Sequence, residues 1–511
     1  MKLKFTLILV LTHLLVSAQS DEWKNPKVNE INRLPMHTHF FAYESKDLAA
    51  QFCPAQSENY LTLNGNWKFN WVNDADQRPM DFFETNFNDK AWSLMPVPGN
   101  WELNGYGDPI YVNVGYPWRN QYNSRSNPIM VQNQNNHVGS YRREIELPAN
   151  WKSKEIIAHF GAVTSNIYLW VNGKYVGYSE DSKLEAEFNL TKYLKPGKNL
   201  IAFQVFRWND GSYLEDQDFW RLSGVSRDCY LYTRNKNHIE DLRITPNLDA
   251  QYTNATLSVE LNVKGKSVVE LELLDKNNAL VEAKTISGKD KISTVFNLEN
   301  PAKWSAENPN LYTLVSTLKD GEKVVEVISQ KVGFRSVEIK NAQLLVNGKA
   351  VLIKGANRHE LDPDGGYVVS RERMRQDIQR MKELNINAVR TCHYPDNNYW
   401  YDLCDEYGIY MVAEANVESH GMGYGDETLA KNADFALAHL QRNQRNIQRG
   451  YNHPAIIIWS LGNEAGFGPN FEACYNWIKA EDNSRLVQYQ GGGNNKFTDI
   501  YCPMYLDYGR S

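Results

Sequence analysis

The stretch AIIIWSLGNEAGFGPN, residues 455–470, carries the strongest fold signal in the chain. Its apolar, β-branched run is typical of a strand buried on both faces, as in parallel sheets covered on both sides. The strand ends at Asn463 and Glu464, and glycines follow. A carboxyl group so placed is partly desolvated, which favours the protonated form that a general acid needs. The structural alternative for Glu464 is an ion pair with Arg358 or Arg390.

The same rhythm of strand and helix runs from about residue 338 to the end of the sequence. Strand centres are expected near residues 354, 389, 411, 457, 487 and 500, with helix-like segments such as SRERMRQDIQRMKELN between them. Strands alternating with helices predict parallel βα units. Polar residues mark the carboxyl ends of five of these strands, as at the active face of a (β/α)8 barrel. They are Asn357, Arg358, His359, Glu360, His393, Glu414, Asn416, Glu418, His420, Asn463, Glu464 and Tyr505.

The two thirds of the chain that precede the barrel pattern read as all-β. Short alternating runs with Asn-Gly, Pro-Gly and Asp-Gly turns fill residues 21–234, and a plainer β pattern fills about residues 236–337. We therefore expect a signal peptide at 1–18, a β-sandwich domain at 19–234, an immunoglobulin-like sandwich at 235–337 and an incomplete barrel at 338–511. A chain of 511 residues is long enough for about three domains.

Composition narrows the class of partner. The net charge of −6 gives no basic patch for nucleic acid. Aromatic residues make up 12% of the chain, which suits stacking on sugar rings but also suits large β-sandwich cores. Six scattered cysteines, without a CxxC pair, are expected to be mostly buried apolar residues.

The first twenty residues, MKLKFTLILVLTHLLVSAQS, have the pattern of a secretory signal. Lys2 and Lys4 precede a short apolar segment, and Val16-Ser17-Ala18 offers small residues at a cleavage point. No later segment is apolar enough to suggest a membrane span. We expect export to the periplasm or the medium, without membrane attachment.

Long, ordered motifs carry a family resemblance over nearly the whole sequence. They are WKNPKVNEINRLP, LNGNWKF, VPGNWELNGYGDPIYVNVGYP, RWNDGSYLEDQDFWRLSGVSRD, GANRHE, VRTCHYP, EANVESHGM, IIIWSLGNEAG and CPMY. The chain resembles glycoside hydrolase family 2, and within it the large, lac-type β-galactosidases. The resemblance implies a sugar-binding jelly-roll sandwich, an immunoglobulin-like domain and a catalytic TIM barrel. It also implies retaining hydrolysis of terminal non-reducing β-D-galactose residues, and allows a homo-oligomer.

The resemblance implies roles for individual residues. Glu464 is the acid/base group, and Mg²⁺ is bound by Glu418, His420 and Glu464. From spacing alone, Glu418 and His420 could equally share a hydrogen bond. Asp218 is a Na⁺ ligand and galactose contact. The other expected contacts are Asn113 and Asn463 with the sugar, His359 and His393 with the transition state, and Tyr505 beside the nucleophile.

The family's nucleophile is a glutamate in a motif like CEYAHAMGN, which the sequence does not contain. Retaining hydrolysis needs two carboxyl groups about 5–5.5 Å apart. Glu472 and Glu481 fall on the helix expected after Glu464 and are poor substitutes. We expect residues 19–511 alone to have no appreciable β-galactosidase activity, and we expect the open barrel edge to make the chain fold poorly or aggregate. Two alternatives stay open: a non-catalytic carbohydrate-binding protein, and another family 2 enzyme such as a β-glucuronidase or β-mannosidase.

Overall fold

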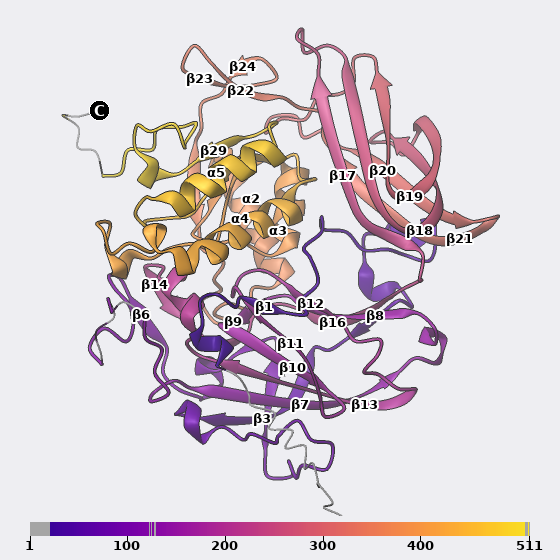
Figure 1. Ribbon diagram of the computed structural model, residues 1–511. Coiled ribbons are helices and arrows are strands. Elements are labelled where there is room, and N and C mark those ends of the chain that lie inside the picture. Colours follow the sequence, from indigo (N-terminus) through magenta and orange to yellow (C-terminus); the bar gives the residue numbers. More distant parts are fainter. Residues whose placement is uncertain (1–20, 122, 124, 127–128, 506–508, 510–511) are drawn as a thin grey trace, which may run out of the picture.

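A computed structural model describes residues 21–121, 123, 125–126, 129–505 and 509. The expected signal peptide lies outside these residues. Figure 1 shows three bodies: a β-sandwich drawn in indigo to magenta, a second β domain in pink, and an orange-to-yellow layer of helices over parallel strands. The predicted fold class, two β domains followed by an incomplete barrel, is confirmed.

The first body is a sandwich of a seven-stranded and a four-stranded antiparallel sheet. The larger sheet has the order β1-β11-β10-β13-β7-β3-β4, and the smaller has β12-β8-β16-β2. Asn172 and Gly173, both with positive φ, form the two-residue turn between β10 and β11, as an Asn-Gly hairpin requires. The strands are β1 (Glu30–Ile31), β2 (Tyr60–Thr62), β3 (Gly65–Val72), β4 (Ser93–Val97), β7 (Val138–Leu147), β8 (Glu155–Phe160), β10 (Asn166–Val171), β11 (Lys174–Glu180), β12 (Ala186–Asn189), β13 (Gly197–Phe206) and β16 (Cys229–Arg234).

Two small sheets lie at the edge of the sandwich. The pair β6 (Ile110–Val112) and β14 (Phe219–Arg221) is antiparallel, and its register sets Val112 opposite Phe219. The other small sheet contains β5 (Gly99–Asn100), β15 (Gly224–Val225) and β9 (Val163–Thr164). The segment between η6 (Asp210–Leu214) and β14 carries Asp216 and Asp218 toward the barrel.

The second body is a sheet of five strands in which β18 and β19 are unusually long. They are β17 (His238–Leu248), β18 (Ala255–Leu274), β19 (Leu280–Leu298), β20 (Tyr312–Asp320) and β21 (Lys323–Val332). Residues 38–49, from the N-terminal part of the chain, lie against this body. Tyr43 forms a backbone bridge with Val327, Thr38 donates to Asp241 at 2.9 Å, and α1 (Lys46–Ala49) follows.

The third body contains five parallel strands in sequence order, β25 to β29, covered by helices. The strands are β25 (Gly355–Arg358), β26 (Ala388–Thr391), β27 (Tyr410–Glu414), β28 (Ile456–Ser460) and β29 (Leu486–Gln488). The helices are α2 (Arg371–Glu383), α3 (Asn398–Tyr407), α4 (Ala436–Gly450) and α5 (Pro469–Glu481). A three-stranded sheet precedes them, formed by β22 (Val337–Lys340), β23 (Gln343–Val346) and β24 (Lys349–Ala350).

The sixth expected strand, near residue 500, is wrong as a full strand. In its place Ile500 makes one isolated parallel bridge to Gln488 on β29. Asp499 accepts from the backbone N–H of Val487 and from the Tyr475 hydroxyl, and Ile500 packs against the core, so these contacts hold the segment without a strand ladder. The other five strands lie where the sequence places them.

Local signals explain the helix limits. Ser370 caps α2 by accepting from the backbone N–H of Arg373, and Asn397 caps α3 in the same way with Tyr399. Gly408 ends α3 with φ +70°, a conformation that favours glycine. All five residues of β28 are buried, which accounts for its apolar run. None of the helices in the described part of the chain has the length and apolar composition that a membrane crossing requires.

The sandwich and the barrel body are joined by buried ion pairs. Arg227 of the sandwich donates to Glu360 at 2.5 Å, and Arg445 of α4 donates to Asp181 at 2.9 Å. All four side chains are buried. The six cysteines are free thiols, four of them buried, as the sequence predicts.

Candidate active site

Glu464 is held at the carboxyl end of β28 in an unusual backbone conformation. Its φ is +32°, in the left-handed region that non-glycine residues rarely adopt. The Tyr424 hydroxyl donates to Oε2 at 2.6 Å, and the Tyr505 hydroxyl donates to Oε1 at 3.2 Å. The side chain is only 14% exposed. The strand end therefore presents one carboxyl group with both oxygens oriented by phenols.

The structural alternative for Glu464 is wrong, because both candidate arginines have other partners. Arg358 donates to Asp377 at 2.9 Å and to Asp396 at 2.7 Å. Arg390 donates to Glu414 at 2.8 Å. Neither guanidinium is committed to Glu464, so its carboxyl group is available for chemistry.

Glu418 lies where the sandwich meets the barrel. Its backbone forms parallel bridges both to Glu215 of the sandwich and to Asn463. One carboxylate oxygen, Oε1, accepts from Asn463 Nδ2 at 2.9 Å, and Arg390 Nη2 donates to Asn463 Oδ1 at 2.8 Å. The other oxygen, Oε2, is buried without a hydrogen-bond partner among the described residues. Burial raises the pKa of Glu418 well above its usual value, and the nearby Asp216 and Asp218 raise it further.

His420 connects Glu418 to the two other carboxylates of the site. It begins η7 (His420–Met422), and its Nδ1 lies 3.4 Å from Asp218 Oδ1 while its Nε2 lies 3.6 Å from Glu464 Oε2. Ligand atoms of Asp218, Glu418 and His420 all lie within 4.8 Å of one another. Burial raises the pKa of Asp218, and His420 opposes that shift. We call these three residues the acidic cluster. They join the sandwich to the barrel.

The donor set of the acidic cluster fits a hard divalent cation. Carboxylate oxygens with one imidazole suit Mg²⁺ better than a softer metal. The buried Oε2 of Glu418, which has no hydrogen-bond partner among the described residues, also favours a bound cation. The family resemblance names Glu464 as the third Mg²⁺ ligand beside Glu418 and His420. The geometry groups Asp218 with those two, and sets Glu464 next to His420 at the edge of the cluster.

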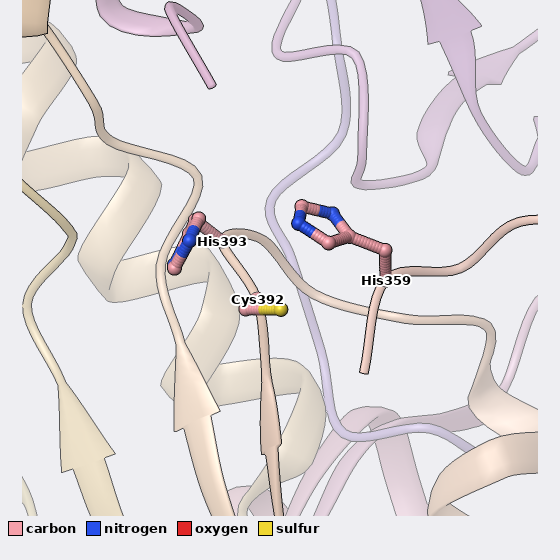
Figure 2. A group of neighbouring side chains, drawn as sticks. All are labelled: His359, Cys392 and His393. Atoms are coloured by element: carbon pink, nitrogen blue, oxygen red, sulfur yellow. The ribbon is translucent and has the colours of Figure 1, made fainter. Parts of the chain in front are cut away.

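His359 and His393 face each other across the ends of β25 and β26, with Cys392 between them (Figure 2). Their ring centroids are 5.5 Å apart and their planes perpendicular. Phe219 stacks on His359 at 3.8 Å, and Glu414 Oε1 lies 2.8 Å from His393 Nδ1. Burial lowers the pKa of His359 to about 3, with contributions from His393 and Lys183. The His359 ring is thereby neutral near pH 7.

Asn113 reaches the same region from the sandwich. The antiparallel pairing of Val112 with Phe219 brings Asn113 alongside Asp218, and its side chain is exposed. Asn463 is buried and supports Glu418 rather than facing open space. Tyr505 is 89% exposed and touches Glu464.

Several polar residues at strand ends serve the structure instead. Arg358 and Glu360 are tied into buried ion pairs, and Asn416 donates to Asp181 and Glu215 between domains. Glu472 and Glu481 lie on α5 as expected, and Glu481 binds Arg243. Sequence reasoning missed Tyr424, Phe219 and Cys392 as neighbours of the site. Phe219 adjoins Asp218 in the quoted motif, but Tyr424 lies in a loop without a pattern that marks it.

Profile comparisons cover almost all of the described chain. Residues 60–235 match "Glycosyl hydrolases family 2, sugar binding domain", residues 237–335 match "Glycosyl hydrolases family 2", and residues 337–510 match "Glycosyl hydrolases family 2, TIM barrel domain". Together with the architecture, they place the chain in the class of multidomain glycoside hydrolases. The chain belongs to glycosyl hydrolases family 2.

Curated relatives of this chain include proteins named β-galactosidase. A "Beta-galactosidase" of Photobacterium profundum is 43% identical over 503 residues, which are 95% of this chain and 48% of the relative. A "Beta-galactosidase" of Alteromonas mediterranea is 42% identical over 508 residues, 96% of this chain and 48% of the relative. This chain thus spans about half the length of these relatives.

Solved structures of glycosidases are among those that resemble this chain. A β-glycosidase from Bacteroides vulgatus has a TM-score of 0.71 at 26% identity, covering 86% of this chain and 55% of that one. A β-glucuronidase from Ruminococcus gnavus has a TM-score of 0.73 at 22% identity, covering 88% and 77%. The second likeness is evidence for the fold alone.

Proposed function

We propose that this chain carries the sugar-binding and acid/base part of a retaining β-galactosidase that releases terminal non-reducing β-D-galactose. The observation that carries the proposal is Glu464, a carboxyl group at the end of β28, oriented by two phenols and free of any arginine. The names of the relatives at 40–43% identity favour galactosides over other sugars.

In the proposed reaction Glu464 donates a proton to the glycosidic oxygen as the bond to the sugar breaks. It then takes a proton from the water that releases the sugar. The hydroxyls of Tyr424 and Tyr505 fix the carboxyl plane. His420, 3.6 Å away, keeps the carboxyl group on the side of the acidic cluster. When the proton donor is already held in place before the substrate arrives, less free energy is needed to orient it.

The acidic cluster is the proposed Mg²⁺ site, with Glu464 at its margin, and Asp218 is a proposed Na⁺ ligand. A bound divalent cation would supply positive charge that keeps the carboxylates of Glu418 and Asp218 ionised. Without it, Glu418 is a buried carboxyl group with one unsatisfied oxygen. Asn463, itself bound by Arg390, donates to the opposite oxygen, so Oε2 is left available for a ligand.

The proposed galactose contacts come from both bodies of the molecule. Asn113 and Asp218 arrive on the edge of the sandwich, and His359 and His393 on the barrel strands. A neutral His359, held flat by Phe219, can accept or donate one hydrogen bond to a sugar hydroxyl. Galactose differs from its epimers only in hydroxyl orientation, so such fixed polar groups provide the selectivity.

Retention requires a second carboxylate about 5–5.5 Å from Glu464, on the other side of the sugar. Glu414 is already bound to Arg390, His393 and Ser460, which leaves it unsuited to attack. We propose that a polypeptide of residues 19–511 has no appreciable β-galactosidase activity by itself.

Export to the periplasm or the medium and a homo-oligomeric state remain part of the proposal, from the N-terminal pattern and the family resemblance. The function is tested by assaying the protein in its full natural length with chromogenic β-galactoside, β-glucuronide and β-mannoside. Preference for the β-galactoside supports the proposal. Preference for the glucuronide or the mannoside would assign the chain to another activity of the same family. Binding of galactosides without turnover would support the non-catalytic alternative.

A further inference from the structure

The His359, Cys392 and His393 side chains converge on one small space beside the proposed sugar site. One ligand atom from each lies within 4.8 Å of the other two. Figure 2 shows the thiol of Cys392 and the ring of His359 directed into the space between β25 and β26. Two imidazoles and a thiol form a nitrogen and sulfur donor set, unlike the oxygen-rich acidic cluster.

Each imidazole of this group has one nitrogen fixed by a neighbour. Glu414 Oε1 lies 2.8 Å from His393 Nδ1, and the Tyr394 hydroxyl lies 3.1 Å from His359 Nδ1. These contacts leave the Nε2 atom of each ring for another partner. A carboxylate bound to the far nitrogen of a histidine is the common second-shell arrangement of metal sites, because it fixes the ring and raises its basicity.

We propose that His359, Cys392 and His393 form a binding site for a soft divalent cation of the Zn²⁺ class, distinct from the Mg²⁺ site. Three protein ligands leave a fourth tetrahedral position open to solvent or to a sugar hydroxyl. Zinc binds nitrogen at about 2.0–2.1 Å and thiolate sulfur at about 2.3 Å. Ligand atoms within 4.8 Å of one another need only small side-chain shifts to reach those distances.

The proton and charge balance of binding is simple. The S–H bond of Cys392 breaks, a sulfur–metal bond forms, and one proton passes to solvent. Lys183 and Arg390 are cations in the surroundings of His359, and both contribute to lowering its pKa. The carboxylate of Glu414, which binds Arg390, and the new thiolate offset them. The net local charge thus does not exclude a divalent ion.

Bound metal would occupy the nitrogens that we assign to galactose. This consequence rests on the proposed function: a Zn²⁺-class ion should inhibit β-galactoside hydrolysis in competition with substrate, whereas Mg²⁺ supports it. Binding itself rests only on the three side chains. The two claims are therefore separable by experiment.

The test uses Co²⁺ as a spectroscopic substitute for Zn²⁺ in the purified protein, with excess Mg²⁺ present to fill the acidic cluster. We expect a near-ultraviolet thiolate-to-cobalt absorption band at one equivalent, abolished by added Zn²⁺. Cys392→Ser should remove the band and weaken Co²⁺ binding at least about tenfold. Glu414→Gln should weaken binding about 10–100-fold while keeping the band, as for other outer partners of metal ligands.

Cys474→Ser is the matched control, because Cys474 is an equally buried thiol on α5. It should retain the band. Circular dichroism checks that each variant is folded. If Cys392→Ser does not fold, X-ray absorption of the Zn²⁺-loaded wild type decides the matter, with one sulfur and two imidazoles expected. Absence of a thiolate band in folded wild type, or a shell without sulfur, would overturn the site. Lack of β-galactosidase activity would not, since that concerns the proposed function alone.

Discussion

The hydroxyl of Tyr424 donates a 2.6 Å hydrogen bond to Oε2 of Glu464, across forty residues of sequence. Because the acceptor is the proposed acid/base group, this bond fixes the proton donor before the substrate binds. A hydrogen bond to a charged group is worth about 1.5–3 kcal/mol, or about 10–100-fold in rate if it acts in the transition state. We expect Tyr424→Phe to lower kcat of the full-length protein by that factor with little change in KM.

The matched control is Tyr475→Phe, which removes another 2.6 Å tyrosine–carboxylate bond, to Asp499. It should leave kcat unchanged. Equal effects of the two substitutions would mean that Tyr424 acts only through stability.

Glu464→Gln removes the transferable proton but keeps the shape of the side chain. General acid–base catalysis typically contributes about 10²–10⁴-fold, so hydrolysis of an alkyl β-galactoside should fall by that amount. An activated aryl galactoside, whose leaving group needs no proton, should be partly spared in the step that breaks the glycosidic bond. Steady-state and burst kinetics with both substrates measure this. Equal losses for the two leaving groups would contradict the acid role.

Without Mg²⁺, the buried carboxyl group of Glu418 should lower the stability of the folded protein. Its folded-state pKa is raised, so the unfolded chain loses this proton first as pH rises. The stability associated with Glu418 is therefore full below its unfolded pKa of about 4.3 and is lost progressively as pH rises from there through its raised folded-state pKa. We expect Glu418→Gln to raise the Tm of the chelated protein at pH 7 and to abolish its stabilisation by Mg²⁺.

Thermal melts of the wild type and the variant, with chelator and with Mg²⁺, measure this directly. The matched control is Glu472→Gln on α5, which is expected to change neither response. A wild-type Tm that is the same with and without Mg²⁺ at saturating concentrations would contradict the metal assignment.

The ion pair between Arg227 and Glu360 joins the sandwich to the barrel body, and both side chains are buried. Breaking such a pair from one side leaves a buried charge without its partner. We expect Glu360→Gln to reduce the free energy of unfolding by about 3–5 kcal/mol. Glu383→Gln, which breaks an exposed pair with Arg380, should cost about 0–1 kcal/mol. Urea unfolding of both variants compares them, and similar midpoints would contradict an interface role.

The domain order and most of the barrel could be predicted from the sequence, because periodicity records which strand faces are buried. The strand at residues 456–460 and the carboxylate that follows it are examples. The segment near Ile500 could not, since hydrogen bonds to Asp499 and a single bridge to Gln488 take the place of a strand ladder. Nor could the packing of residues 38–49 on the second body, which depends on a backbone bridge to Val327.

The residues of the candidate site could be predicted where they lie in the matching motifs. The side-chain contacts between them could not. The pairing of Glu414 with Arg390 and His393 joins the ends of two strands, β26 and β27, across 24 and 21 residues of sequence. The contact of Phe219 with His359 crosses from the sandwich to the barrel. Such contacts arise from tertiary packing between distant segments, and the periodicity of a single sequence does not reveal them.

The central claim is that the side chains between the sandwich and the barrel recognise galactose. Titration calorimetry of the purified protein, in Mg²⁺, with a galactose-configured iminosugar and its glucuronic-acid-configured counterpart tests it without requiring turnover. Asp218→Asn provides the variant. We expect the galactose-configured ligand to bind at least about tenfold more tightly than its counterpart, and Asp218→Asn to remove that preference. Tighter binding of the glucuronic-acid-configured ligand, or a preference unaffected by Asp218→Asn, would contradict this claim.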